Sequence, residues 1–116
     1  MIKNLFDNFN FVNYVDWGID AKEFEYKKPS ELDPNVAYPL RGFYISSMSE
    51  FGPQAVFISD TFKVNCPKGY VEKVKELLKD EECIEAVKNN LCAFKVERYY
   101  VDKYNTYGYH FKIVTR

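Results

Sequence analysis

Three segments in the middle of the chain have the composition and alternation of β-strands. Residues 41–46 (RGFYIS) and 54–59 (QAVFIS) are rich in β-branched and aromatic side chains, and residues 62–66 alternate apolar with polar positions. Both patterns are typical of strands. Gly52-Pro53 lies between the first two segments, and Asp60-Thr61 lies between the second and the third. The pattern therefore predicts a strand, a loop, a second strand, a tight turn and a third strand.

The hydrophobic period changes after Pro67. Between residues 69 and 90 apolar side chains recur at helical spacing, with charged residues between them. Asp80-Glu81-Glu82 can cap a second helix, so the segment predicts either one kinked helix or two short ones. Residues 93–101 and 107–115 return to a strand pattern, and the five residues 102–106 join them. This arrangement predicts a β-hairpin.

The first forty residues lack a sustained period. Only residues 22–28 alternate aromatic with charged side chains, which predicts one strand in an otherwise irregular lead-in. Residues 28–35 contain two prolines and several turn-forming residues, which indicates a surface loop or a single helical turn.

The order of the predicted elements from residue 40 onwards is three strands, a helical segment and two strands. This is the order of the OB-fold, a partly open β-barrel. We therefore predict a mainly β protein, with a five-stranded antiparallel OB-like barrel over residues 40–116 and an irregular N-terminal extension over residues 1–39. An α+β sandwich, with the helix across an open antiparallel sheet, has the same element list.

Length and composition fit one domain over residues 1–116. The chain has 116 residues, of which 47% are hydrophobic, and its ten Tyr, ten Phe and one Trp are too many for a disordered chain. No run of about 18 apolar residues is present, and the first residues lack the apolar segment of a secretory signal. We therefore expect a cytoplasmic protein that does not contact a membrane.

The three cysteines predict neither a disulfide framework nor a metal site. Cys66, Cys83 and Cys92 are odd in number and form no C-x-x-C pair. A zinc site could combine them with His110, but their spacing matches no common ligand pattern. Buried, reduced thiols describe them better, so we expect no metal and no cofactor.

Charge is unevenly distributed along the chain. Residues 1–60 contain five basic and nine acidic side chains, whereas residues 61–116 contain eleven basic and eight acidic ones, for a whole-chain charge of −1. In the predicted final hairpin Lys95, Lys103 and Lys112 lie among several aromatic residues. Cations that contact phosphates and rings that stack on bases are the two requirements for binding single-stranded nucleic acid.

Position in the predicted elements selects the aromatic candidates. Phe51 and Tyr104 lie in the two hairpin loops that flank the ligand groove of an OB-fold. Tyr44 shares its strand face with small residues, and Tyr99 shares its face with charged ones, so we expect both rings to be exposed. In contrast, a stripe of apolar residues on the final strand predicts a core-facing side. The members of this stripe are Tyr107, Tyr109, Phe111 and Ile113.

Two further basic residues complete the predicted nucleic-acid-binding set. Arg41 opens the first strand of the barrel, and Lys63 alternates outwards between Phe62 and Val64. No enzyme is predicted, because the chain has one histidine and none of the common catalytic or nucleotide-binding motifs.

Several segments together resemble small single-stranded-DNA-binding proteins of bacteriophages and mobile elements. These segments are residues 38–45 (YPLRGFYI), 49–54 (SEFGPQ), 62–67 (FKVNCP) and 78–82 (LKDEE), with the tyrosine-rich final hairpin. The resemblance covers about 80 residues. It implies an OB-like fold, sequence-tolerant binding of single-stranded DNA during replication or recombination, and assembly into a homo-oligomer.

A second function fits the same residues. Exposed Tyr and Phe side chains are common anchors of protein interfaces, and a net charge near zero suits such a role. The alternative prediction is therefore a small phage-type protein that binds and modulates a host or phage protein, for example a replication protein, including inhibition by nucleic-acid mimicry.

Overall fold

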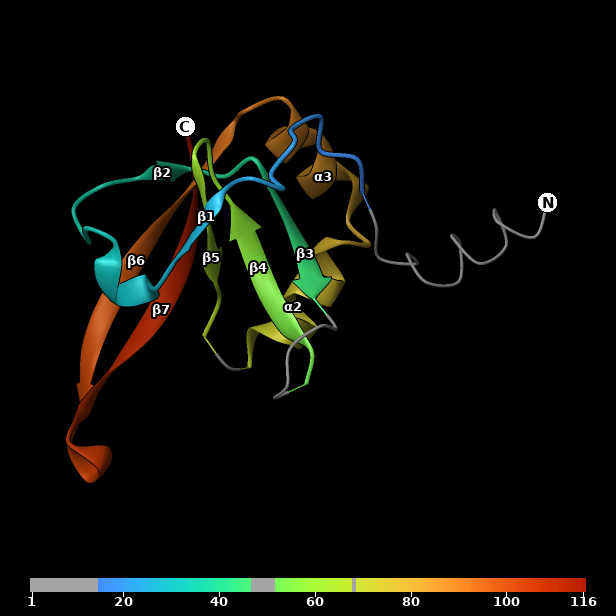
Figure 1. Ribbon diagram of the computed structural model, residues 1–116. Coiled ribbons are helices and arrows are strands. Elements are labelled where there is room, and N and C mark those ends of the chain that lie inside the picture. Colours follow the sequence, from blue (N-terminus) through green and yellow to red (C-terminus); the bar gives the residue numbers. More distant parts are fainter. Residues whose placement is uncertain (1–14, 47–51, 68) are drawn as a thin grey trace.

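Two β-sheets and two α-helices make up the structure, a computed structural model that describes residues 15–46, 52–67 and 69–116 (Figure 1). The strands are β1 (Glu25–Lys27), β2 (Tyr38–Pro39), β3 (Gly42–Ser46), β4 (Gln54–Ile58), β5 (Phe62–Asn65), β6 (Cys92–Val101) and β7 (Thr106–Thr115). The helices are α2 (Tyr70–Leu77) and α3 (Glu81–Lys88), with short 3-10 turns η1 (Pro29–Glu31) and η2 (Asp102–Tyr104). The mainly β character and the predicted strands of residues 41–66 and 93–115 are confirmed.

The first sheet has the order β1-β5-β4-β3. β3, β4 and β5 form the antiparallel meander that the alternation predicts, with Phe43 opposite Phe57 and Phe57 opposite Val64. β1 belongs to the predicted extension and pairs in parallel with β5. This part of the extension is therefore a strand of the main sheet.

The second sheet has the order β2-β6-β7. β6 and β7 are antiparallel over ten consecutive residue pairs, from Cys92 opposite Thr115 to Val101 opposite Thr106. β2 covers the other edge of β6 only at Phe94 and Ala93. β6 is thus paired on both sides only near the base of the hairpin, and β7 is an edge strand.

One extended segment connects the two sheets. Its first part, β2, pairs with β6, and its second part, β3, pairs with β4. Leu40 lies at the crossing and is fully buried, and its backbone N–H donates to the Cys92 carbonyl at 3.0 Å. The next residue, Arg41, donates its N–H to the Ile58 carbonyl at 2.8 Å, so the chain changes sheet within one residue.

The predicted barrel does not close among the described strands. Aromatic rings hold the two sheets face to face: the Phe57 ring lies 5.3 Å from that of Phe94 and 5.5 Å from that of Phe111, between centroids. Packing of two sheets over a shared core leaves the strand edges apart, whereas a barrel joins them. The mainly β prediction is therefore confirmed, but the described strands form two packed sheets of four and three strands in place of the predicted five-stranded OB-like barrel.

The helical segment consists of two short helices, one of the two forms that the sequence predicts. Asp80 separates them, and its carboxylate accepts a hydrogen bond from the Cys83 N–H at 3.1 Å, as an N-cap does. Val74 of α2 and Val87 of α3 are buried in the core, and α2 packs against β3 and β4. Neither helix of the described chain has the length and apolar character to cross a membrane.

Candidate nucleic-acid interface

The far half of the β6–β7 hairpin, residues 97–110, projects beyond the sheets and is called the arm (Figure 1). β6 and β7 have ten residues each, whereas the other strands have two to five. At about 3.3 Å per residue, five additional residue pairs extend about 17 Å past the core. The arm therefore exposes both of its faces and carries much of the aromatic surface of the molecule.

The hairpin has one face that packs into the core at its base, through Phe94, Val96 and Phe111. The inner face of the arm is the continuation of this face beyond the core. The Val96–Phe111 pair is buried, but the next pairs outward are increasingly exposed. Tyr109 packs against the edge of the core, and Tyr100 and Tyr107 are each about half exposed. Of the predicted core-facing stripe only Phe111 is thus buried: Tyr107 and Tyr109 lie where the strand extends past the core, and Ile113, at the base, is 37% exposed.

Tyr100 and Tyr107 form an organised cluster with one cation. Their rings are 5.4 Å apart in an edge-to-face arrangement, and the Arg98 guanidinium lies 4.4 Å from the centre of the Tyr107 ring. The Tyr100 hydroxyl also donates a hydrogen bond to the Asn105 side chain. Sequence alternation did not select these three arm residues, but the length of the predicted strands relative to their neighbours indicates that their ends overhang.

The outer face of the hairpin carries three of the predicted binding residues. Lys95 and Lys112 lie directly opposite each other just below the arm, and Tyr99 is on the arm and 53% exposed. The Tyr99 ring lies over Gly108, since a Cβ at that glycine would approach the ring to 2.4 Å. The Tyr99 ring is therefore held against the backbone four residue pairs, about 13 Å, from the Lys95–Lys112 pair, with the Glu97–His110 pair between them on the same face.

A hydroxyl from α2 fixes the position of β7 at the base of the arm. The Tyr70 hydroxyl accepts a hydrogen bond from the Phe111 N–H at 2.9 Å and is hydrogen-bonded to Nδ1 of His110 at 2.8 Å. Burial raises the pKa of Tyr70, so the hydroxyl remains protonated. These contacts connect the arm to the helices.

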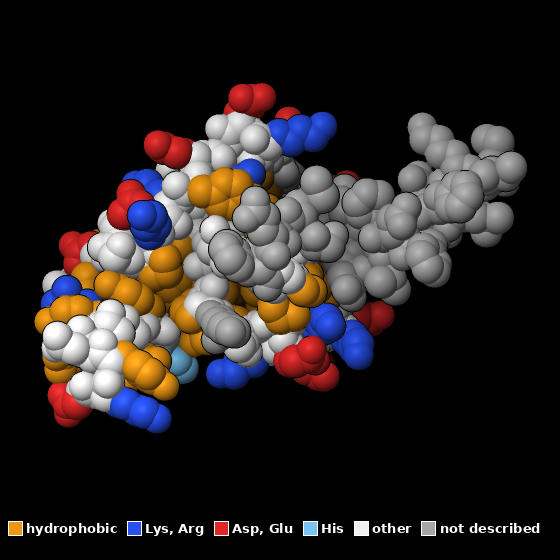
Figure 2. Space-filling model, turned by 60° about the horizontal axis from the view of Figure 1, so that its bottom comes forward, with side chains coloured by type: hydrophobic (Ala, Val, Ile, Leu, Met, Phe, Trp, Pro, Cys, Tyr) orange, Lys and Arg blue, Asp and Glu red, His pale blue; other side chains and the backbone are white. Residues whose placement is uncertain are grey.

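The tip of the arm presents the other two predicted hairpin residues. Tyr104 is the most exposed of the large apolar side chains in the described chain, at 69%, and the Lys103 ammonium is 5.5 Å from the centre of its ring. Asn105 ends the turn in the left-handed conformation, with φ of 50°. Figure 2 shows hydrophobic side chains at the left of the molecule, with basic groups beside them.

The other predicted binding residues lie away from the arm. Arg41 forms an ion pair with Asp60 at 2.8 Å. Lys63 is only 8% exposed, because the Tyr26 ring of β1 covers its ammonium at 4.3 Å. Its predicted exposure is wrong, since alternation gives the face of a strand but not what covers that face.

Tyr44 is half-buried, in contrast to the exposed ring predicted for it. Tyr26 and Tyr44 come from the two edge strands of the first sheet, and their hydroxyls hydrogen-bond at 2.8 Å. Burial, followed by this contact, raises the pKa of Tyr44. Phe51 lies outside the described residues.

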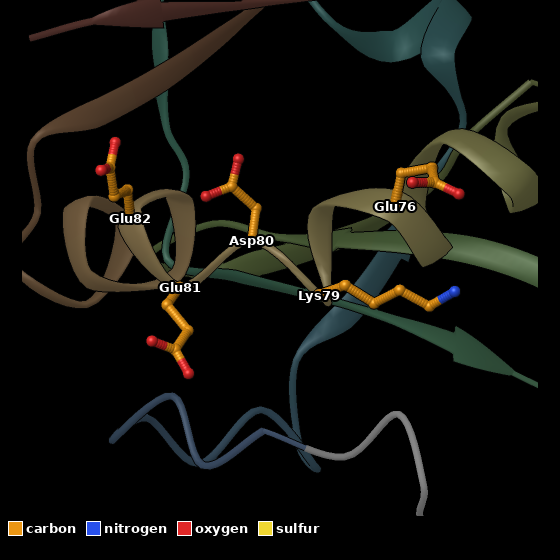
Figure 3. A pocket seen from close by; sticks show the side chains of 5 residues that line it. All are labelled: Glu76, Lys79, Asp80, Glu81 and Glu82. Atoms are coloured by element: carbon orange, nitrogen blue, oxygen red, sulfur yellow. The ribbon is translucent and has the colours of Figure 1, made fainter.

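The helices contribute a shallow depression but no converging ligands. It lies at the junction of α2 and α3 and is lined by Glu76, Lys79, Asp80, Glu81 and Glu82 (Figure 3). The carboxylates point in different directions in Figure 3, and Asp80 is occupied as the helix cap. Asp80 of this acidic cluster thus caps α3, as the sequence predicts.

No metal-binding group forms from the cysteines of the described chain. Cys66 is buried, and its burial raises the pKa of the thiol. No set of three or more His, Cys, Asp or Glu side chains among the residues described is arranged to hold a metal ion.

The charge of the hairpin differs in sign from that of the remaining chain. Residues 91–116 contain five basic and two acidic side chains, which gives +3, so residues 1–90 carry −4 of the whole-chain charge of −1. Cations and exposed rings are thus concentrated on the same element.

Comparison with known proteins gives no match to any family, to any curated protein or to any solved structure.

Proposed function

We propose that this protein binds single-stranded DNA through the β6–β7 hairpin, in a sequence-tolerant manner suited to replication or recombination. The observation that supports the proposal is the combination of exposed tyrosine rings and basic side chains on the β6–β7 hairpin, since residues 91–116 together carry a charge of +3. Unpaired bases stack on aromatic side chains for about 1–3 kcal/mol per base, and the sequence of the DNA matters little to that stacking. Cations supply the contacts to phosphates.

The outer face and the tip provide the first contacts in this proposal. Lys95 and Lys112 bind the phosphates of one stretch of the strand, and the Tyr99 ring stacks on a base nearby. Tyr104 stacks on a base at the tip, where Lys103 neutralises a phosphate. Arg41, Tyr44 and Lys63 are not contacts in this form of the proposal, because they are ion-paired, half-buried and buried, respectively.

Stacking at the tip is tested by a matched pair of substitutions. Tyr104→Leu removes the ring and retains an apolar side chain, whereas Tyr104→Phe retains the ring. We expect Tyr104→Leu to weaken binding of a fluorescein-labelled oligothymidine by about fivefold to a hundredfold, and Tyr104→Phe by less than about twofold. Fluorescence anisotropy measures both. Equal affinities for the two variants and the wild type would contradict stacking at this position.

The contribution of the lysines is tested by salt dependence. The three cations assigned to phosphates, Lys95, Lys103 and Lys112, predict a slope of log affinity against log salt of about −2. Lys95→Ala should reduce the magnitude of this slope by about 0.7, whereas Lys22→Ala, at an exposed lysine outside the hairpin, should leave it unchanged. The absence of oligothymidine binding at low salt would overturn the proposal.

A replication or host protein is the second candidate partner. The near-neutral charge of the whole chain favours it, since such a charge gives little long-range attraction to DNA. Exposed tyrosines then act as interface anchors. The oligothymidine experiment distinguishes the two functions, because a protein that acts only through this second kind of interface does not bind oligothymidine.

A further inference from the structure

The outer edge of β7 is unpaired along the arm. In the sheet order β2-β6-β7, β7 is an edge strand. The Phe111 N–H points away from β6, because it donates to the Tyr70 hydroxyl. Backbone groups of an antiparallel strand alternate in direction, so the N–H and C=O groups of Tyr109 and Tyr107 also point outwards. No strand of the described chain pairs with them.

This edge lacks the features that usually keep such strands apart. Edge strands are commonly protected by proline, by lysine or by a bulge. Residues 106–110 (TYGYH) contain neither proline nor lysine, and the pairing of β6 with β7 is continuous through them. Tyr70 closes the edge at Phe111, so the open stretch is limited to these five residues.

The stretch is complementary to itself. Antiparallel pairing of residues 106–110 with the same residues of another copy is centred on Gly108 and places Tyr107 opposite Tyr109 of the second copy. Each of the two Tyr107–Tyr109 pairs exchanges two backbone hydrogen bonds, for about four in all. Thr106 then lies opposite His110 of the second copy, so no two like-charged Lys, Arg, Asp or Glu side chains oppose each other.

We propose that two copies of this protein dimerise through the β7 edges of their arms. The four strands form one continuous sheet, with the tyrosines of both inner faces side by side. A two-stranded hairpin is only marginally stable in water, and additional strands stabilise it. Cross-strand aromatic pairs add to the stability of the joined sheet. The inference does not rest on DNA binding and is tested without DNA.

Two variants that both carry lysine at position 110 test the proposed register. Thr106→Lys/His110→Lys places lysines opposite each other at both ends of the interface, whereas Thr106→Asp/His110→Lys places an aspartate opposite each lysine. Both variants lose the His110 contact with Tyr70, so this loss is matched. Sedimentation equilibrium measures the dimer of the 13.7 kDa chain, and the emission of the buried Trp17 confirms that each variant is folded.

We expect the wild type to dimerise and the double-lysine variant to dimerise about tenfold or more weakly. The aspartate–lysine variant should regain wild-type dimerisation within about threefold. Three outcomes would overturn the proposal: a wild-type protein that remains monomeric up to about 1 mM, equal dimerisation of the two variants, or weaker dimerisation of the aspartate–lysine variant.

Discussion

The contact between Trp17 and Gly42 attaches the N-terminal segment to the first sheet. Trp17 is buried, and its Nε1–H donates to the Phe43 carbonyl at 3.0 Å. The indole lies so close to Gly42 that a Cβ there would be 2.6 Å from its Cγ. Because the hydrogen bond fixes the indole, the ring has little freedom to move aside.

Gly42→Ala should therefore destabilise the protein. We expect the free energy of unfolding to fall by about 1–3 kcal/mol, the usual cost of overpacking in a core. Urea unfolding followed by circular dichroism measures the change. In a Trp17→Leu background the same substitution should cost clearly less, and an equal cost in both backgrounds would exclude the indole as the cause.

Cys66 and Tyr44 make the free energy of unfolding depend on pH in the alkaline range. Burial raises the pKa of both groups above their ordinary values of 9.0 and 10.0. In the unfolded chain they ionise at those values, whereas in the folded protein they remain protonated. Stability from these groups is thus fully present below pH 9.0 and is lost as the pH rises through the raised pKa values.

We expect the urea midpoint to decline as the pH rises above 9.0. Cys66→Ala should flatten the first part of the decline, because the alanine has no proton to retain. A midpoint that increases over this range would contradict the assigned direction. Circular dichroism at a series of pH values gives the midpoints.

At the scale of elements, the N-cap of α3 separates the two helices. Asp80→Ala removes the acceptor of the Cys83 N–H and should lower the free energy of unfolding by about 1 kcal/mol. Asp80→Ser retains a capping oxygen and should cost less than half as much. Urea unfolding compares the two variants, and an equal loss would indicate that the cap does not stabilise the helix.

The strands and helices could be predicted locally, but the environment of several side chains could not. Alternation and helical spacing depend on near neighbours, so β3 to β7 and the helices follow from the sequence. Lys63 is covered by Tyr26 through a parallel pairing of β1 with β5, which no local pattern contains. Tyr107 has core-facing alternation yet is exposed, because the body of the protein ends before the strand does.

At the scale of the whole molecule, local sequence patterns could not predict whether the strands form a barrel or two packed sheets. The same strand order permits a barrel or two packed sheets, and long-range contacts such as that of Phe57 with Phe94 and Phe111 decide between them. The candidate site was predicted in part for the same reason. The predicted residues of the hairpin lie together on β6, β7 and the turn between them, whereas the surroundings of Arg41 and Lys63 depend on contacts with distant segments.

The crossing at Leu40 has a consequence for the order of folding. β3, β4 and β5 are joined by short connections. In contrast, β2 can pair only after β6 is available, and β6 is more than fifty residues further along the chain. Closing such a long loop is slow compared with forming local hairpins. During synthesis the apolar face at Phe57 therefore remains uncovered until residues 92–115 have emerged, and this interval is when the chain is most prone to aggregate.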